Sequence, residues 1–162
     1  MSKNEEFLNW FGDSKAINAH WEPRVYYHRS RSKEVFNEFK WEGDGVIRNP
    51  YNNHYGFFFV PQEDKKHISY IGDGIEVLVY LRMETPFWIS DDGNGGIKDQ
   101  DGKRYEALDV TREMVDILIE RGFDSLIIDC PTVYSQFVVF NPNQIKSTEN
   151  NGEFSTETNN IK

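Results

Sequence analysis

Residues 134–147 (YSQFVVFNPNQIKS) constrain the fold more than any other stretch of this chain. They predict an alternating strand, then a turn at Asn141-Pro142-Asn143, then a second short strand. Because side chains alternate between the two faces of a strand, Gln136 shares a face with Val138 and Phe140. A polar amide on an apolar face needs a partner. Either a neighbouring loop satisfies this amide, or the amide contacts a ligand at the floor of a cleft.

The composition fits a single domain over residues 1–162. With 162 residues, of which 38% are hydrophobic and 15% aromatic, the chain can bury a core. No apolar run approaches the roughly 18 residues of a membrane helix, and no cleavable leader is evident, so we expect a soluble cytoplasmic protein. The single cysteine, Cys130, excludes an internal disulfide and a cysteine metal cage. The histidines lack metal-ligand spacing, so no metal site is predicted.

The formal net charge of −9 disfavours broad binding to a phosphate backbone. We therefore expect a macromolecular partner to be protein rather than nucleic acid, and we expect no membrane partner. From about residue 148 onward Glu, Asn, Ser and Thr dominate, which predicts a loosely ordered tail over 148–162.

Turn residues divide the chain into short segments, rich in strands and poor in long helices. The predicted segments are a helix over 5–11, strands over 25–28 and 56–60, a short helix over 62–71, a strand over 75–83, a mobile surface loop over 91–102, a helix from 111 to 122, and strands over 123–129 and 136–140. Together with the short strand after the turn, the sequence predicts an α+β domain of about six strands and two or three short helices.

Several motifs in order resemble the ADP-ribosyltransferase-like domains that phages and mobile elements carry in polyvalent and MuF-type proteins. Besides 134–147, these motifs are Trp10-Phe11-Gly12-Asp13-Ser14-Lys15, then Pro23 with Val25-Tyr26-Tyr27-His28-Arg29-Ser30, and Asn150-Asn151-Gly152-Glu153-Phe154. The resemblance extends over roughly residues 7–162. It implies a split β-sandwich around an NAD cleft, with NAD as substrate, in the cytoplasm of a bacterial host.

The resemblance also implies which residues form the site. In the branch that includes diphtheria toxin and the poly-ADP-ribose polymerases, a His, a Tyr and a Glu frame NAD, and His28, Tyr70 and Gln136 look like their counterparts. His28 would hydrogen-bond the adenosine ribose, and the main chain of Arg29 would pair with the nicotinamide carboxamide. Phe58 and Tyr70 would stack on the nicotinamide ring. The residues expected to bind NAD are His28, Arg29, Ser30, Gly56, Phe58 and Tyr70.

Three positions depart from the family pattern. Gln136 stands where relatives have Glu, Arg29 where they have Gly, and His67 where they often have a small hydroxyl residue. A neutral amide can accept a hydrogen bond from a ribose hydroxyl, but it supplies no full charge to the cationic sugar that forms when the nicotinamide bond breaks. The loss of one such electrostatic element costs on the order of 3 kcal/mol, about a hundredfold in rate.

Three hypotheses for the function remain open at this point. The first is a mono-ADP-ribosyltransferase of phage or mobile-element origin that uses NAD to modify a host macromolecule, with protein favoured. The second is a catalytically silent module that binds NAD, ADP-ribose or a host protein, for example as an inhibitor of a defence system. The third is a virion structural component. The sequence does not name the acceptor.

Overall fold

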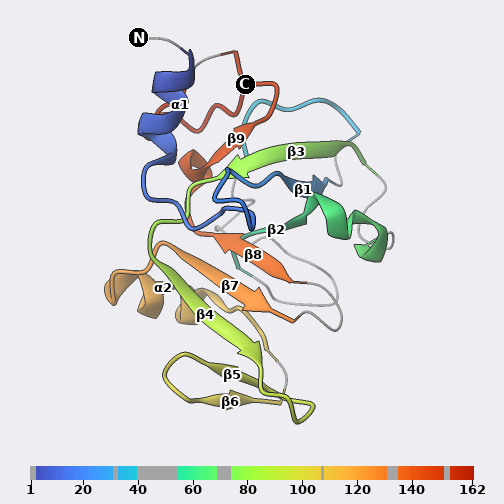
Figure 1. The fold of residues 1–162 in the computed structure, drawn as a ribbon, viewed down its shortest axis with the longest axis vertical. Helices are drawn as coiled ribbons and strands as arrows, with labels where there is room; N and C mark the ends of the chain where they lie inside the picture. Colours follow the sequence, from blue (N-terminus) through green and yellow to red (C-terminus); the bar gives the residue numbers. More distant parts are fainter. Residues whose placement is uncertain are drawn as a thin grey trace.

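The computed structural model describes residues 3–30, 33–39, 55–68, 74–106, 108–130, 135–151 and 154–162. The strands in these residues form one mixed sheet with the order β6-β5-β4-β7-β8-β2-β1-β3-β9 (Figure 1). Their bounds are Tyr26–Arg29 for β1, Phe57–Pro61 for β2, Glu76–Leu81 for β3, Pro86–Asp91 for β4, Ile97–Asp99 for β5, Arg104–Tyr105 for β6, Ser125–Asp129 for β7, Gln136–Val139 for β8 and Ile145–Ser147 for β9. The helices are α1 (Lys3–Phe11), α2 (Arg112–Glu120) and the 3-10 helices η1 (Gln62–Ile68) and η2 (Pro142–Gln144).

The α+β class agrees with the sequence prediction, but the described residues contain nine strands where about six were predicted. The additional strands are β4, β5 and β6. Part of the segment predicted as a mobile loop forms β5, because Asp92 accepts hydrogen bonds from the backbone N–H groups of Asn94 and Gly96 and from the Arg104 guanidinium. β5 and β6, with three and two residues, are too short to show a periodicity of two, so the sequence did not indicate them, whereas the six-residue β4 was missed.

The sheet opens between β1 and β2. These two strands pair only through Tyr26 with Pro61 and Tyr27 with Val60. Beyond this point β1 stays paired with β3, whereas β2 stays paired with β8. Figure 1 shows the consequence: β1, β3 and β9 lie above, and β8, β7 and β4 run obliquely below them. The sheet is therefore split into two parts, with β1 and β2 at the division.

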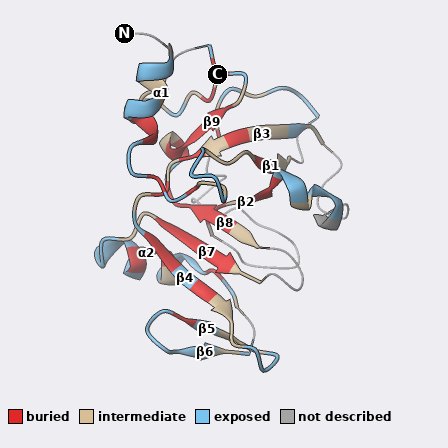
Figure 2. Cartoon of the chain, viewed as in Figure 1, coloured by how far each residue is buried: buried red, intermediate tan, exposed pale blue. Residues whose placement is uncertain are grey.

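Apolar residues on the two faces of the lower half-sheet belong to different clusters. One cluster contains Phe59 and Phe137 together with Tyr26 of β1. The other contains Leu126 and Val138, covered by Val115 and Leu118 of α2. Figure 2 shows the buried residues concentrated along β7, β8 and β9. Both faces of β8 are thus packed, which fixes its register.

Helix α2 begins and ends as the sequence predicts. The Thr111 side chain caps it by accepting a hydrogen bond from the Met114 N–H, and Gly122, with φ of +91°, follows its end. The sequence predicts a packed face of Met114, Ile117, Leu118 and Arg121. The structure buries Leu118 together with Val115 instead, and Ile117 is 48% exposed.

The carboxyl-terminal residues are held more firmly than their composition predicts. Ile161 is fully buried, its N–H donates to the Asn37 carbonyl, and its carbonyl accepts from the Ser147 N–H. The ammonium of the fully buried Lys146 donates to the Thr158 and Asn160 carbonyls. One apolar residue and backbone hydrogen bonds therefore anchor the described end of this polar segment.

In the part of the chain that the structure describes, no helix has both the length and the apolar character needed to span a bilayer.

Candidate active site

His28 lies where β1 and β2 separate. Its Nδ1 donates a hydrogen bond to the Phe58 carbonyl of β2, at 2.9 Å. The imidazole also contacts the rings of Phe39 and Phe59, with centroids 5.1 Å and 5.3 Å away. Because Phe58 is beyond the last paired residue of β2, the side chain of His28 satisfies a carbonyl that the β1 backbone no longer reaches.

This hydrogen bond fixes the tautomer of His28. A carbonyl oxygen only accepts, so Nδ1 carries the proton, and in the neutral ring Nε2 is an acceptor. Burial lowers the pKa of His28 below the ordinary value of 6.5, and the hydrogen bond to Phe58 opposes part of this shift. The imidazole is therefore neutral at pH 7, and Nε2 can accept a hydrogen bond from a hydroxyl group.

The lowered pKa predicts a pH-dependent loss of stability. Since the folded state resists protonation of His28, the unfolded state binds more protons once the pH falls below 6.5, and the free energy of unfolding decreases there. We expect His28→Asn to reduce the difference in free energy of unfolding between pH 7.5 and pH 5.5, measured by urea denaturation. Residues 17–23 form a hairpin in which Ile17 pairs with Pro23, and His20 is exposed on it. His20→Asn should keep the wild-type difference, and an equal change in both variants would contradict this account.

The backbone of Arg29 faces the opening between β1 and β2. The Ser30 N–H donates to the Ile75 carbonyl at 2.9 Å, and the Ser30 carbonyl accepts from the Gly74 N–H at 3.0 Å, so the backbone of Ser30 points away from β2. Hydrogen-bonding direction alternates along an antiparallel strand. The N–H and carbonyl of Arg29 therefore point toward β2, at a level where β2 no longer pairs with β1.

The Arg29 side chain is also unusual. Its Nε is buried and has no hydrogen-bond partner among the described residues. The cross-strand carboxylate, Glu76, already accepts from the Tyr27 hydroxyl at 3.1 Å and from the Lys65 ammonium at 2.7 Å. The Arg29 guanidinium is thus a cation beside the opening, and the carboxylate of Glu76 opposite it is already hydrogen-bonded to Tyr27 and Lys65.

Gly56 and Phe58 form the β2 side of the opening. A Cβ at Gly56 would lie 2.6 Å from Cγ1 of Val138, and Gly56 has φ of +125°, so any other residue there would be strained and would clash with the Val138 side chain. Phe58 is paired with Val138 and packs on the cluster under α2. The ring of Phe58 is partly buried, so part of it remains accessible.

Gln136 is the first residue of β8, opposite Ile128 of β7. As the sequence predicts, it shares a face with Val138, which packs in the cluster under α2. Its amide has no hydrogen-bond partner among the described residues, so none of these satisfies it. β1 and β8 flank β2, which puts the backbones of His28 and Gln136 about 10 Å or more apart, from two strand spacings.

Tyr70, the third residue of the implied catalytic set, lies outside the described residues. The segment before it, predicted as a short helix, forms the 3-10 helix η1. The structure thus brings the His28 imidazole, the Arg29 backbone and the β2 backbone at Gly56 and Phe58 to the opening, and it places Ser30 just after β1. The imidazole contacts Phe59 on one face of β2, whereas the side chains of Phe58 and Gln136 lie with Val138 on the opposite face, so the structure does not bring these side chains together with His28.

Arg24 and Glu63 form a pair that the sequence gave no reason to expect. The two side chains form an ion pair, and the Arg24 guanidinium lies 5.9 Å from the ring centre of Tyr26 and 5.7 Å from that of Phe137. Phe137 is the neighbour of Gln136. The pair joins residues 39 positions apart, and no local pattern reports such a contact.

Other residues of the motifs are structural. Gln144 makes four hydrogen bonds: its Oε1 accepts from the N–H groups of Phe140 and Asn141, and its Nε2 donates to the carbonyls of Arg82 and Asp124. Trp10 donates to the Asn143 carbonyl at 3.0 Å. Gln144 therefore fixes the end of β8 and the turn that follows it.

A surface depression of about 590 Å³ lies away from these residues, over β4, β5 and β6. It is lined by Trp88, Ser90, Asp91, Asp92, Asn94, Lys98, Asp99, Gln100 and Arg104, and none of the candidate site residues borders it. Among the described residues no group of His, Cys, Asp and Glu side chains is arranged to hold a metal ion.

The split sheet, with a histidine at its division, is consistent with an ADP-ribosyltransferase domain. The family described as ADP-ribosyltransferase in polyvalent proteins matches residues 18–154. Because this match extends over more than half of the 162 residues, the chain belongs to that family, and the recognition made from the sequence is confirmed. Comparisons with curated proteins and with solved structures found no match.

Proposed function

We propose that this protein is an NAD-dependent mono-ADP-ribosyltransferase of phage or mobile-element origin, which acts in the cytoplasm of a bacterial host on a host macromolecule, in our view a protein. The family supports ADP-ribosyl transfer. The observation that carries the proposal is the opening between β1 and β2, where the Nε2 acceptor of His28 lies next to the backbone edge of Arg29, which does not pair with β2.

In this proposal the Arg29 backbone binds the nicotinamide carboxamide. A carboxamide has one acceptor and two donor hydrogens, and the N–H and carbonyl of one residue complement it as a neighbouring strand would. Phe58, and Tyr70 by resemblance, stack on the nicotinamide ring. The neutral His28 accepts a hydrogen bond from a hydroxyl of the adenosine ribose through Nε2. Ser30 and Gly56 shape the two ends of this NAD site.

The chemical step breaks the bond between C1′ of the ribose and the nicotinamide nitrogen. The electron pair leaves with nicotinamide, and a lone pair of the acceptor forms the new bond to C1′, after which the acceptor loses its proton to solvent. Gln136 accepts a hydrogen bond from the ribose hydroxyl. Because its amide is neutral, it stabilises the cationic sugar less than a carboxylate would, and we expect slow turnover.

This function is tested by mass spectrometry of proteins from a bacterial lysate incubated with the protein and NAD. We expect ADP-ribose adducts that depend on His28. The absence of any adduct that requires His28 would refute the proposal.

His28→Ala should weaken NAD binding because it removes the acceptor for a ribose hydroxyl. The loss of one neutral hydrogen bond costs about 1.5 kcal/mol, roughly tenfold in Kd. Isothermal titration calorimetry with NAD measures this change, with His20→Ala as the control expected to bind like wild type. Equal affinity of His28→Ala and wild type would remove His28 from the site.

A second candidate function is a catalytically silent module that binds NAD, ADP-ribose or a host protein, for example to inhibit a defence system. The neutral amide at Gln136 and the guanidinium of Arg29 favour it, because both give the site less negative charge than a cationic sugar requires. High NAD turnover by the unmodified protein would eliminate this candidate.

A further inference from the structure

Trp21 has two features that each cost free energy, an exposed indole and a backbone in the left-handed region. It is 84% exposed, and it is the non-glycine residue with a positive φ, +62°, in the described part of the chain. A bulky side chain in the left-handed region costs about 1 kcal/mol or more. Hairpin turns usually have Gly at positions with such a positive φ. An indole left in water also forgoes the free energy of burial. Such strain is maintained only where the surrounding structure enforces it.

Asn18 enforces this conformation. Its Oδ1 accepts hydrogen bonds from the N–H groups of His20 and Glu22, at 2.8 Å and 3.1 Å, and its carbonyl accepts from the Trp21 N–H at 3.1 Å. The Asn18 N–H donates to the Glu22 carbonyl at 2.8 Å. The turn is thus fixed by its backbone and by Asn18. The indole makes no hydrogen bond or ring contact with the described residues, so the fold does not require it.

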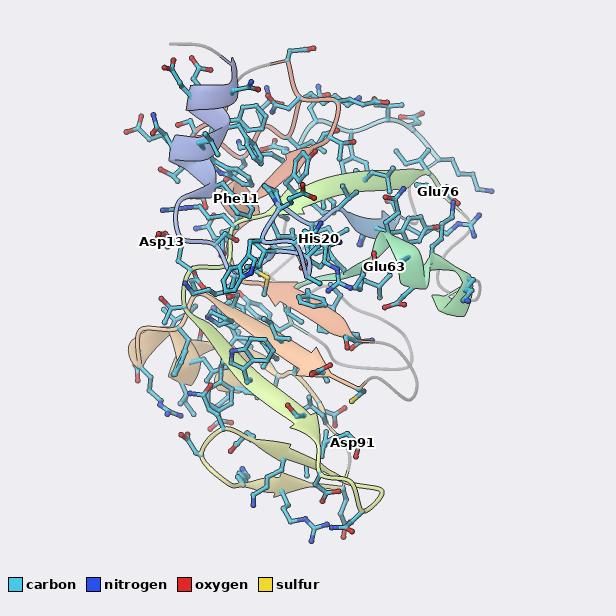
Figure 3. All side chains as sticks on the ribbon, viewed as in Figure 1. Phe11, Asp13, His20, Glu63, Glu76 and Asp91 are labelled. Atoms are coloured by element: carbon cyan, nitrogen blue, oxygen red, sulfur yellow. The ribbon has the colours of Figure 1, made fainter. Side chains whose placement is uncertain are left out.

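The hairpin is anchored to the strands that carry the candidate site. Its second arm runs into Arg24, whose guanidinium lies over Tyr26 of β1 and Phe137 of β8 and pairs with Glu63. Figure 3 labels His20 of the hairpin and Glu63. Three residues span at most about 10 Å, so the backbone of Trp21 lies within that distance of the backbone of Arg24, whose guanidinium contacts Tyr26 of β1 and Phe137 of β8.

The charge around Trp21 restricts the class of its partner. Residues 16–23 contain no Lys or Arg, although Lys15 precedes them, and Arg24, which follows them, is paired with Glu63. Glu22, the next residue after Trp21, is exposed, and the chain carries a net charge of −9. These charges repel nucleic acid phosphates and anionic lipid headgroups. They fit a protein surface with basic groups around an apolar recess. A rigid, exposed indole is the kind of side chain that dominates protein interfaces, since little entropy is lost when it is buried.

We infer that Trp21 is the anchor by which the acceptor protein docks beside the active site, its indole entering an apolar recess rimmed by basic residues. This inference rests on the proposed transferase function. In this inference the hairpin binds the acceptor protein near the opening between β1 and β2. The residues of the opening bind NAD.

Trp21→Gly separates folding from docking. Glycine accepts φ of +62° without strain, so the midpoint of thermal unfolding should stay the same or rise. Hydrolysis of NAD with water as acceptor should stay within twofold of wild type. Incorporation of biotinylated ADP-ribose into the proteins of a bacterial lysate should fall at least tenfold. Trp21→Asn should give the same results as Trp21→Gly, because Asn also tolerates this φ. Trp88→Ala is the control: Trp88 is an indole on β4 that is 42% exposed, and this variant should label lysate proteins like wild type.

Each other outcome contradicts the inference in a different way. Wild-type labelling by Trp21→Gly would overturn it while leaving the transferase function intact. A parallel fall in NAD hydrolysis would assign Trp21 to the NAD site, and an equal loss in Trp88→Ala would show that no specific anchor exists. A wild-type dimer in size-exclusion chromatography that dissociates in Trp21→Gly would assign the indole to self-association. If the wild-type protein labels nothing, the proposed function fails and the inference falls with it.

Discussion

Gln144→Leu should lower the free energy of unfolding by about 4 kcal/mol. The substitution keeps most of the volume but removes four hydrogen bonds to backbone groups of Phe140, Asn141, Arg82 and Asp124, each worth about 1 kcal/mol. Gln144 is 6% exposed, so water does not replace these bonds fully. A domain of this size has a stability of roughly 5–15 kcal/mol. Urea denaturation and thermal unfolding measure the loss, which corresponds to roughly 10 °C.

Gln100→Leu is the matched control. The Gln100 side chain is exposed and accepts one hydrogen bond, from the Trp88 N–H at 3.0 Å, so the same substitution should cost less than about 1 kcal/mol. If both variants lose equal stability, the four hydrogen bonds of Gln144 do not hold the end of β8 to its surroundings as described.

Gln136→Glu should accelerate the release of nicotinamide from NAD by about a hundredfold. A carboxylate at the start of β8 would stabilise the cationic sugar that forms as the glycosidic bond breaks, which is worth on the order of 3 kcal/mol. Because no described residue hydrogen-bonds the native amide, the substitution breaks no hydrogen bond among them. Nicotinamide release under saturating NAD measures the rate.

Gln62→Glu controls for the added negative charge, since Gln62 is exposed at the start of η1 and should leave the rate unchanged. A large gain in Gln136→Glu alone would show that the scaffold is competent and that the native amide suppresses the chemistry. No gain would place Gln136 away from the reacting ribose.

The sequence predicts best where a structure depends on local pattern. The cap at Thr111, the stop at Gly122 and the alternation of Val77, Val79 and Leu81 are each visible within a few residues, and the structure contains the corresponding helix and strand. The role of Gln144 was also predictable, because its motif joins a strand, a turn and a second strand.

Features that depend on distant parts of the chain were not predictable in this way. The Arg24–Glu63 pair and the burial of Ile161 against the core arise only when segments far apart in the sequence meet. The strain at Trp21 has the same origin, since the identity of the residue gives no indication of its φ. At the candidate site, the residue types came from the family pattern, whereas the opening between β1 and β2 is a property of pairing that only the fold reveals.

A crystal structure with a non-hydrolysable NAD analogue tests the central claim most directly. We expect the ligand in the opening between β1 and β2, with its carboxamide bonded to the N–H and carbonyl of Arg29 and a ribose hydroxyl donating to Nε2 of His28. A ligand bound elsewhere, or an Nε2 of His28 beyond hydrogen-bond distance of both riboses, would contradict the claim that this opening is the NAD site.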